Sequence, residues 1–204
     1  FQPNAAMEIV MDEETVDRYY EQTHTALGVV YASPYHLMVV DLVREAAVGA
    51  DGAPVVWTHT YERMLPTSEG AVVSVPVCSG AFVLLRQYRH ALRKSQIAFP
   101  RGYGEPGLSA AENLVKELRE EIGAEKVTDI RYLGAVAADS GILGKEVDVY
   151  ACTVEDPAFR FRYEGIEELI LLPQEEMDAW IQEGRITDGF TLAAYALYRV
   201  REGQ

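Results

Sequence analysis

Residues 100–123, which read PRGYGEPGLSAAENLVKELREEIG, decide the fold because they join a glycine-rich loop to a strongly marked amphipathic helix. Ser109 followed by Glu112 is the pattern of a capping box, which indicates where a helix begins. Gly123 stands where a left-handed residue commonly ends one. The apolar residues between them recur at helical spacing, at Ala111, Leu114, Val115, Leu118 and Ile122. The spacing therefore predicts a helix over residues 109–123 with one buried face.

Three carboxylates gather beside the apolar face of this helix. At about 100° per residue, Glu117, Glu120 and Glu121 share one adjoining arc, although like charges four residues apart repel each other. A hard divalent cation would reverse that cost, because Mg²⁺ typically binds carboxylates, waters and substrate phosphate oxygens. The other interpretation is a solvated acidic face with ion pairs such as Glu112 with Lys116. Composition alone leaves both interpretations open.

The spacing of these residues resembles the signature of the Nudix superfamily. That signature is a glycine, five residues, a glutamate, seven residues, and then arginine, glutamate, apolar, any residue, two glutamates, any residue and glycine. The chain matches it in register at Gly102, Glu117, Leu118, Glu120, Glu121 and Gly123. Leu108 replaces the first glutamate and Lys116 replaces the arginine. The resemblance implies that Glu117, Glu120 and Glu121 bind Mg²⁺ or Mn²⁺, and that Glu120 and Glu121 are catalytic. Lys116 keeps the charge of the arginine that orients them, without its planar fork.

A longer stretch resembles the ADP-ribose and sugar-nucleotide pyrophosphatases of that superfamily. Residues 82–89 and 98–102 are similar to the strand and loop before the signature, and residues 184–194 to the last helix and its lead-in. This resemblance implies that Arg89 contacts the pyrophosphate. It also implies that Arg101 contributes a backbone carbonyl to the metal, and the positive charge of Arg101 makes it a further candidate for binding the anionic substrate.

The same resemblance implies which residues bind the nucleoside half of the substrate. Trp57 occupies a position from which these relatives stack an aromatic ring on adenine, often across a dimer. Trp57 is equally consistent with a residue of the core or of a dimer interface. Arg63 is a candidate for the same ligand, the alternative being an ordinary exposed arginine.

A general base is still required for hydrolysis. The similar enzymes can use a glutamate on a loop that corresponds to residues 163–168, where Glu164 is the first candidate and Glu168 the second. Each is equally consistent with an ordinary surface carboxylate. Glu146 and Asp148, which follow another loop, are further candidates.

The implied activity is the metal-dependent hydrolysis of ADP-ribose or a related nucleoside diphosphate sugar to a nucleoside monophosphate and a sugar phosphate. The alternative is a protein of the same fold that binds such a ligand with weak or no turnover. Leu108 and Lys116 motivate the alternative, whereas retention of all three helix glutamates favours the enzyme.

Composition is compatible with this interpretation and excludes some partners. The 204 residues include 32 acidic and 18 basic side chains, a net charge of −14, which argues against a nucleic-acid surface. The sequence has no apolar stretch of about 20 residues and no signal peptide, so we expect a cytoplasmic protein that does not span a membrane. Cys78 and Cys152 lie in apolar runs and are expected to be reduced core thiols.

The predicted architecture is an α/β fold, specifically a Nudix-type α/β/α sandwich with a mixed sheet and a small N-terminal β region. Residues 1–6 resemble an expression-tag remnant, residues 7–66 form the N-terminal helix and β region, and residues 67–204 form the main domain. The resemblance implies that the N-terminal region helps to form a homodimer. Helices are predicted at residues 12–22, 109–123, 173–182 and 187–201. Strands are predicted at residues 27–31, 37–43, 54–60, 71–77, 81–86, 132–137, 147–153 and 168–172.

Overall fold

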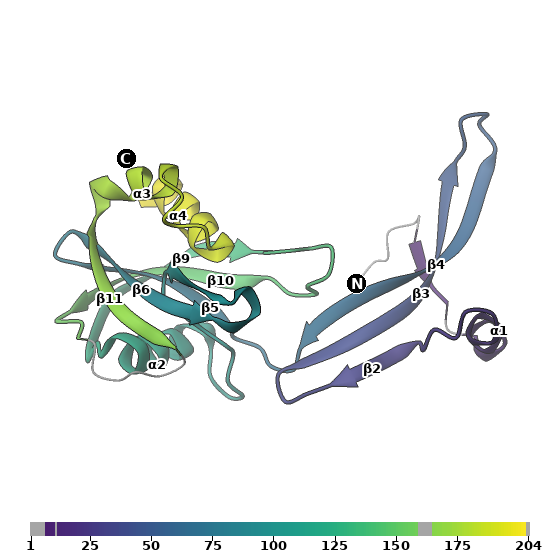
Figure 1. The fold of residues 1–204 in the computed structure, drawn as a ribbon, viewed down its shortest axis with the longest axis horizontal. Coiled ribbons are helices and arrows are strands. Elements are labelled where there is room, and N and C mark those ends of the chain that lie inside the picture. Colours follow the sequence, from purple (N-terminus) through teal and green to yellow (C-terminus); the bar gives the residue numbers. More distant parts are fainter. Residues whose placement is uncertain (1–6, 11, 159–164, 203–204) are drawn as a thin grey trace. The chain divides into compact units, whose positions relative to one another are not determined.

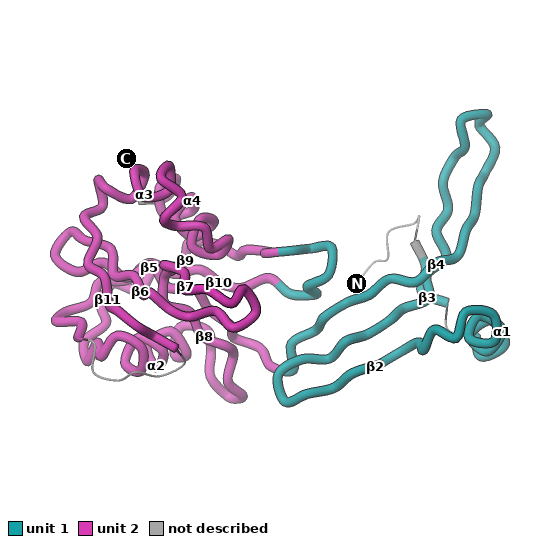
Figure 2. Tube along the Cα trace, viewed as in Figure 1, with its two compact units in different colours: residues 1–67, 139–145 teal, residues 68–138, 146–204 magenta. Residues whose placement is uncertain are grey.

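The computed structural model describes residues 7–10, 12–158 and 165–202. The chain divides into two compact units, which Figure 2 shows in different colours. Unit 1 comprises residues 1–67 and 139–145, and unit 2 comprises residues 68–138 and 146–204. The segment 139–145 groups with unit 1 because the Gly144 N–H donates to the Met64 carbonyl at 3.0 Å.

Unit 1 is a four-stranded antiparallel sheet with one helix. Its elements are β1 (Met7–Ile9), α1 (Glu13–Thr23), β2 (Gly28–Ala32), β3 (His36–Val48) and β4 (Pro54–Pro66). The predicted helix and three strands are present, but β3 and β4 extend well beyond the predicted ranges. Their pairing continues from His36 with Pro66 to Val48 with Pro54, because a backbone ladder does not require the apolar alternation that ends near Val43.

Unit 2 is built on a seven-stranded mixed sheet in the order β11-β6-β5-β10-β9, with β7 beside β6 and β8 beside β5. The strands are β5 (Val72–Cys78), β6 (Ala81–Arg89), β7 (Lys94–Ala98), β8 (Arg101–Gly102), β9 (Lys126–Val136), β10 (Val147–Glu155) and β11 (Ile166–Pro173). Strands β5 and β10 run parallel, and the other pairs run antiparallel.

Helices cover both faces of this sheet (Figure 1). Helix α2 (Ala110–Ile122) lies on one face, and α3 (Met177–Gln182) and α4 (Gly189–Glu202) lie on the other. The short turns η1 (His90–Leu92) and η2 (Gln174–Glu176) complete the unit. The predicted α/β/α sandwich with a mixed sheet is therefore confirmed. No helix of the described part of the chain is long and apolar enough to span a membrane.

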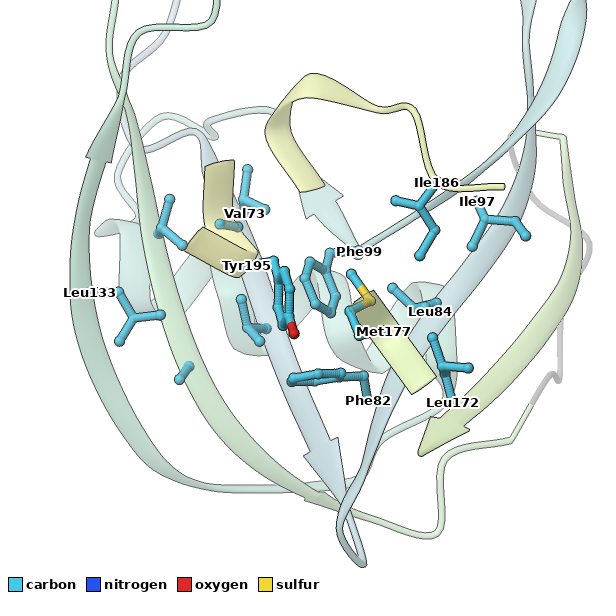
Figure 3. Close-up of a cluster of buried hydrophobic side chains, with 14 residues drawn as sticks. Val73, Phe82, Leu84, Ile97, Phe99, Leu133, Leu172, Met177, Ile186 and Tyr195 are labelled. Carbon is cyan, nitrogen blue, oxygen red and sulfur yellow. The ribbon is translucent and has the colours of Figure 1, made fainter. Parts of the chain in front are cut away.

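Two apolar clusters fill the space between the sheet and its helices, and the alternation of β5 divides its side chains between them. Val72 packs with Leu114, Leu118 and Ile122 on the α2 face. Val73 packs in the cluster on the α4 face, which Figure 3 shows with Phe82, Phe99, Met177 and Tyr195. The Phe82 ring meets the rings of Phe99, Tyr195 and Tyr198 edge to face at centroid distances of 5.6, 5.8 and 5.2 Å.

Local turn chemistry was more predictable than element boundaries. Ser79 and Gly80 both adopt positive φ, 48° and 84°, as the predicted hairpin between β5 and β6 requires. The predicted helix over residues 173–182 is a 3-10 turn followed by the short helix α3. Strands β1, β7 and β8 were not predicted, because short strands contain too few residues to display a period.

Candidate active site

Helix α2 begins and ends where the sequence predicted. The Glu112 N–H donates to Ser109 Oγ at 3.3 Å, and the Ser109 N–H donates to Glu112 Oε2 at 2.9 Å, which completes the capping box. Gly123 ends the helix with φ 62°, and its N–H donates to the Leu118 carbonyl. Because Leu114 and Leu118 are fully buried against the sheet, the rotation of the helix is fixed, and so is the arc on which its glutamates lie.

Glu117 lies directly against the backbone of Gly102. A Cβ atom added to Gly102 would stand 2.2 Å from Glu117 Cγ, 2.3 Å from Cδ and 2.5 Å from Oε1. No residue with a side chain fits there without moving the glutamate. The match of Gly102 and Glu117 to the family pattern therefore has a steric reason: glycine lets the carboxylate approach the peptide that joins Arg101 to Gly102.

The other two glutamates of the predicted metal site, Glu120 and Glu121, differ in burial. Glu121 is only 8% exposed, whereas the side chain of Glu120 is 57% exposed and contacts Lys116 Nζ at 2.7 Å. Carboxylate oxygens are the donors that Mg²⁺ and Mn²⁺ prefer, and a carboxylate held against a glycine backbone suits such an ion. Among the described residues, no three His, Cys, Asp or Glu side chains are already grouped closely enough to hold a metal ion.

Lys116 contacts one carboxylate of the loop and two of helix α2. Its Nζ lies 3.0 Å from Glu105, 3.9 Å from Glu117 and 2.7 Å from Glu120. The hydrogen bond to Glu120, together with the one to Glu105, raises the pKa of the Lys116 ammonium despite its partial burial. The lysine at the arginine position thus contacts two of the three helix glutamates, Glu117 and Glu120.

The loop before α2 is held by hydrogen bonds from helix α2 and from strand β5. On the α2 face, Asn113 is fully buried, and its Nδ2 donates to the carbonyls of Gly70 at 3.1 Å and Tyr103 at 2.9 Å. The Pro100 carbonyl accepts from both the N–H and the hydroxyl of Ser74, at 3.0 and 2.9 Å. These bonds fix the path of the backbone that Glu117 touches.

The Arg101 side chain lies on the opposite face from the glutamates. Arg101 pairs with Val73, a residue of the α4-face cluster, and paired residues present their side chains to the same face. The guanidinium contacts Asp188 Oδ2 at 3.2 Å and lies 5.0 Å from the centroid of the Phe190 ring. The side chain therefore holds the loop from the α4 face, and the metal role expected of Arg101 concerns only its carbonyl.

One acidic candidate lies in the same cross-strand row as Gly102. Gly102 pairs with Val72 on β5, and Val72 pairs with Asp148 on β10. Val72 packs against α2, so Asp148 faces the same side of the sheet as Glu117. Tyr150, two residues later on that face, meets the Tyr132 ring at 5.2 Å. Burial, and then the Asp148 carboxylate, raise the pKa of the Tyr150 hydroxyl.

The other predicted site residues of unit 2 divide between the two faces. Arg89 ends β6 and alternates with Val83 and Leu85 of the α2-face cluster, so it lies on the α2 face. Glu168 pairs with Arg86, whose Nε donates to it at 2.9 Å, and both lie on the α4 face. Glu146 is exposed just before β10. Glu164, the first candidate for the base, lies outside the described residues.

Trp57 and Arg63 belong to β4 of unit 1. Trp57 is 40% exposed and stands opposite Glu45 on β3. Arg63 donates two hydrogen bonds to Asp41, from Nε to Oδ2 and from Nη2 to Oδ1, and hydrogen bonding to Asp41 raises the pKa of the guanidinium.

Three buried polar residues that sequence reasoning did not single out help to hold the loop. They are Asn113, Asp188 and Thr191. Asp188 lay inside the predicted helix at residues 187–201, whereas in the structure it precedes α4, which begins at Gly189, at a position where aspartate is a preferred cap. Asn113 had none, because its partners are backbone carbonyls, those of Gly70 and Tyr103, which no side-chain pattern reveals.

A mixed α/β/α sandwich with a carboxylate-bearing helix packed on a glycine loop defines a class of fold and site that many proteins share. A family model described as the NUDIX domain matches residues 68–188, more than half of the chain. The chain therefore belongs to the Nudix family, as its residues indicated.

The chain is also similar to individual proteins and to a solved structure, and it spans about a third of the length of the first of these relatives. The ADP compounds hydrolase NudE of Escherichia coli (strain K12) is 38% identical over 65 residues, which is 32% of this chain and 35% of that protein. The methanol dehydrogenase activator of Bacillus methanolicus is 26% identical over 148 residues, 71% of this chain and 80% of that protein. A crystal structure of an ADP compounds hydrolase superposes with a TM-score of 0.60 at 21% identity, covering 86% of this chain and 90% of the other, and so shares its fold.

Proposed function

We propose that this protein hydrolyses the pyrophosphate bond of ADP-ribose or a related nucleoside diphosphate sugar, giving a nucleoside monophosphate and a sugar phosphate. The observation that carries the proposal is the contact of Glu117 with the Gly102 backbone, on the same helix as the buried Glu121. Burying a carboxylate is unfavourable unless hydrogen bonds or a cation compensate for it, and a bound divalent cation would supply part of that compensation.

The residues that would hold a divalent cation are Glu117, Glu120 and Glu121, with the carbonyl of Arg101. When bound, Mg²⁺ or Mn²⁺ would neutralise the diphosphate and lower the pKa of a coordinated water. Glu120 would have to exchange its contact with Lys116 for the cation, since the two are 2.7 Å apart. A salt bridge of two partly exposed groups is weak, so this exchange is energetically accessible.

Arg89 and a carboxylate complete the proposed chemistry on the α2 face. Arg89 would bind the phosphate oxygens and stabilise the charge that develops during bond cleavage. Glu164 or Asp148 would accept the proton of the attacking water. The strand register favours Asp148 among the described candidates, because Glu168 faces α4 and its carboxylate accepts from Arg86.

Recognition of the nucleoside is proposed for unit 1. Trp57 offers an exposed aromatic ring on which a base can stack, whereas the Arg63 guanidinium already binds Asp41 through two hydrogen bonds. Between these two residues, Trp57 therefore has the stronger claim to the ligand.

We propose a homodimer formed through unit 1, because its sheet buries little of its own apolar surface. Of the apolar residues described in unit 1, Val10, Val40, Leu42 and Val43 are buried, whereas a larger set is exposed. The exposed set includes Val29, Val30, Tyr31, Tyr35, Val48, Val55, Val56 and Trp57. Apolar surface of this kind commonly marks an interface. Sedimentation equilibrium should give twice the chain mass of 22.7 kDa, and a monomeric mass at micromolar concentration would refute the dimer.

A second function is supported by a specific feature of the site. Lys116 Nζ already occupies the space between Glu105, Glu117 and Glu120, and the relative that matches most of this chain's length is named as an activator of another enzyme. A protein of this kind would bind the nucleotide sugar and turn it over slowly or not at all.

The test is a panel of nucleoside diphosphate sugars that includes ADP-ribose, assayed with and without Mg²⁺ and Mn²⁺. The wild type should release AMP from ADP-ribose only with metal, and Glu121→Gln should lower that rate by about 1,000-fold, since a charged group that stabilises the transition state is lost. The control is Glu125→Gln, at a neighbouring exposed acid outside the helix. If the wild type and the Glu121→Gln variant are equally inactive but still bind the ligand, the second function, binding with slow or no turnover, is supported instead.

A further inference from the structure

We propose that Asp188 is a positioning residue, which holds the Arg101 to Gly102 peptide in place for the metal from the opposite face of the sheet. The inference deepens the proposed function and rests on it, because it concerns the same metal site. Asp188 touches neither Glu117 nor the expected substrate face, so its effect must pass through the backbone.

Both carboxylate oxygens of Asp188 are engaged, although the residue is only 6% exposed. Oδ1 accepts from the Thr191 N–H at 2.9 Å and from the Thr191 hydroxyl at 2.8 Å. Oδ2 lies 3.2 Å from Nη1 of Arg101. The carboxylate thus caps the first turn of α4 with one oxygen and binds the loop with the other.

Thr191, which is bonded to Asp188, also holds the residue at the other end of this loop, Phe99. Its hydroxyl oxygen accepts from the Phe99 N–H at 3.0 Å, in a fully buried position. The N-terminal end of α4 therefore holds both Phe99 and Arg101, and the Phe190 ring packs against the Arg101 guanidinium. The peptide whose carbonyl is expected to face the metal lies at the end of this short, doubly held segment.

Because neighbouring residues of a strand face opposite sides of the sheet, holding Arg101 on one face also positions Gly102 on the other. Arg101 and Gly102 form β8, so the Arg101 side chain projects toward α4 while the α-carbon of Gly102 faces Glu117. A tether on one face therefore sets the position of the backbone on the other. Groups that orient metal ligands without touching the metal commonly change metal affinity by about 10- to 100-fold.

The plain structural alternative is that Asp188 only caps α4. Asp188→Asn separates the two roles, because asparagine caps helices about as well as aspartate while its amide loses the ion pair with Arg101. Arg101→Gln removes the same ion pair from the other end, and so provides a second variant should Asp188→Asn fail to fold. Asp178→Asn is the matched control, since Asp178 also contacts α4, through Tyr195 at 2.8 Å and Arg199 at 2.7 Å, but is remote from the loop.

The experiment measures Mn²⁺ binding to the full chain without substrate, by electron paramagnetic resonance, and amide hydrogen exchange of the metal-free protein. Asp188→Asn should weaken Mn²⁺ binding by about tenfold and accelerate exchange at Arg101, Gly102 and Tyr103. Asp178→Asn should remain within about twofold of the wild type in both measurements.

Unchanged Mn²⁺ affinity and unchanged exchange in a folded Asp188→Asn or Arg101→Gln variant would overturn the inference, and so would a wild type that binds no Mn²⁺. A wild type that binds Mn²⁺ with the predicted sensitivity to Asp188, but hydrolyses no nucleotide sugar, would overturn the proposed activity and leave this positioning role standing.

Discussion

The two faces of the unit 2 sheet differ in how their carboxylates are paired with cationic side chains. On the α4 face, Asp188 binds Arg101 and Asp178 binds Arg199, so each acid has its own arginine. On the α2 face, one ammonium, that of Lys116, lies within 4 Å of three carboxylates, those of Glu105, Glu117 and Glu120, and Glu121 and Asp148 share that face. These α4-face acids are thus paired one to one with arginines, whereas on the α2 face one lysine is shared by three carboxylates, where we propose that a divalent cation binds.

The largest effect that this comparison predicts concerns the proton acceptor. Asp148→Asn should lower kcat for ADP-ribose by about 100- to 10,000-fold with little change in KM, the range expected when a general base is lost. Glu168→Gln removes an acid from the α4 face and should leave kcat within about twofold. Steady-state kinetics at saturating Mg²⁺ provides the measurement.

Two outcomes would break this assignment. If Glu168→Gln lost most of its kcat while Asp148→Asn kept the wild-type value, the proton acceptor would lie on the α4 face and the assignment would be wrong. Full activity in both variants would favour Glu164, which lies outside the described residues.

A somewhat smaller effect is expected at the contact between the loop and α2. Gly102→Ala introduces a methyl group where Glu117 atoms lie 2.2 to 2.5 Å away, so the carboxylate must move by about 1 Å. Displacements of that size cost about 100-fold in activity, which should appear in kcat/KM while the circular dichroism spectrum stays that of the wild type.

The matched control is Gly189→Ala at the beginning of α4, where an added Cβ would meet nothing within 4 Å. This variant should retain wild-type activity. If Gly102→Ala were equally active, the close approach of Glu117 would have no part in catalysis.

Sequence alone revealed most of what is local in this molecule. The capping box at Ser109 and the glycine at position 123 placed α2 correctly, because each signal lies within a few residues of the structure it specifies. The hairpin at Ser79 followed from turn chemistry for the same reason. The family resemblance supplied the sandwich that joins these pieces.

What sequence could not supply depends on contacts between distant segments. The row of Gly102, Val72 and Asp148 exists only because β5 lies between β8 and β10, and no period within one segment encodes that order. The pairing of Arg101 with Asp188 spans two elements as well. It also explains why an arginine assigned to the substrate has its side chain on the other face.

The most direct test of the proposed metal site is Mn²⁺ binding by the wild type, Glu121→Gln and Glu168→Gln, followed by electron paramagnetic resonance without substrate. We expect Glu121→Gln to weaken binding by at least about tenfold, because a carboxylate ligand becomes neutral, and Glu168→Gln to bind as the wild type does. Equal Mn²⁺ affinity in all three proteins, or a wild type that binds no Mn²⁺, would contradict the claim that the α2 face is a metal site.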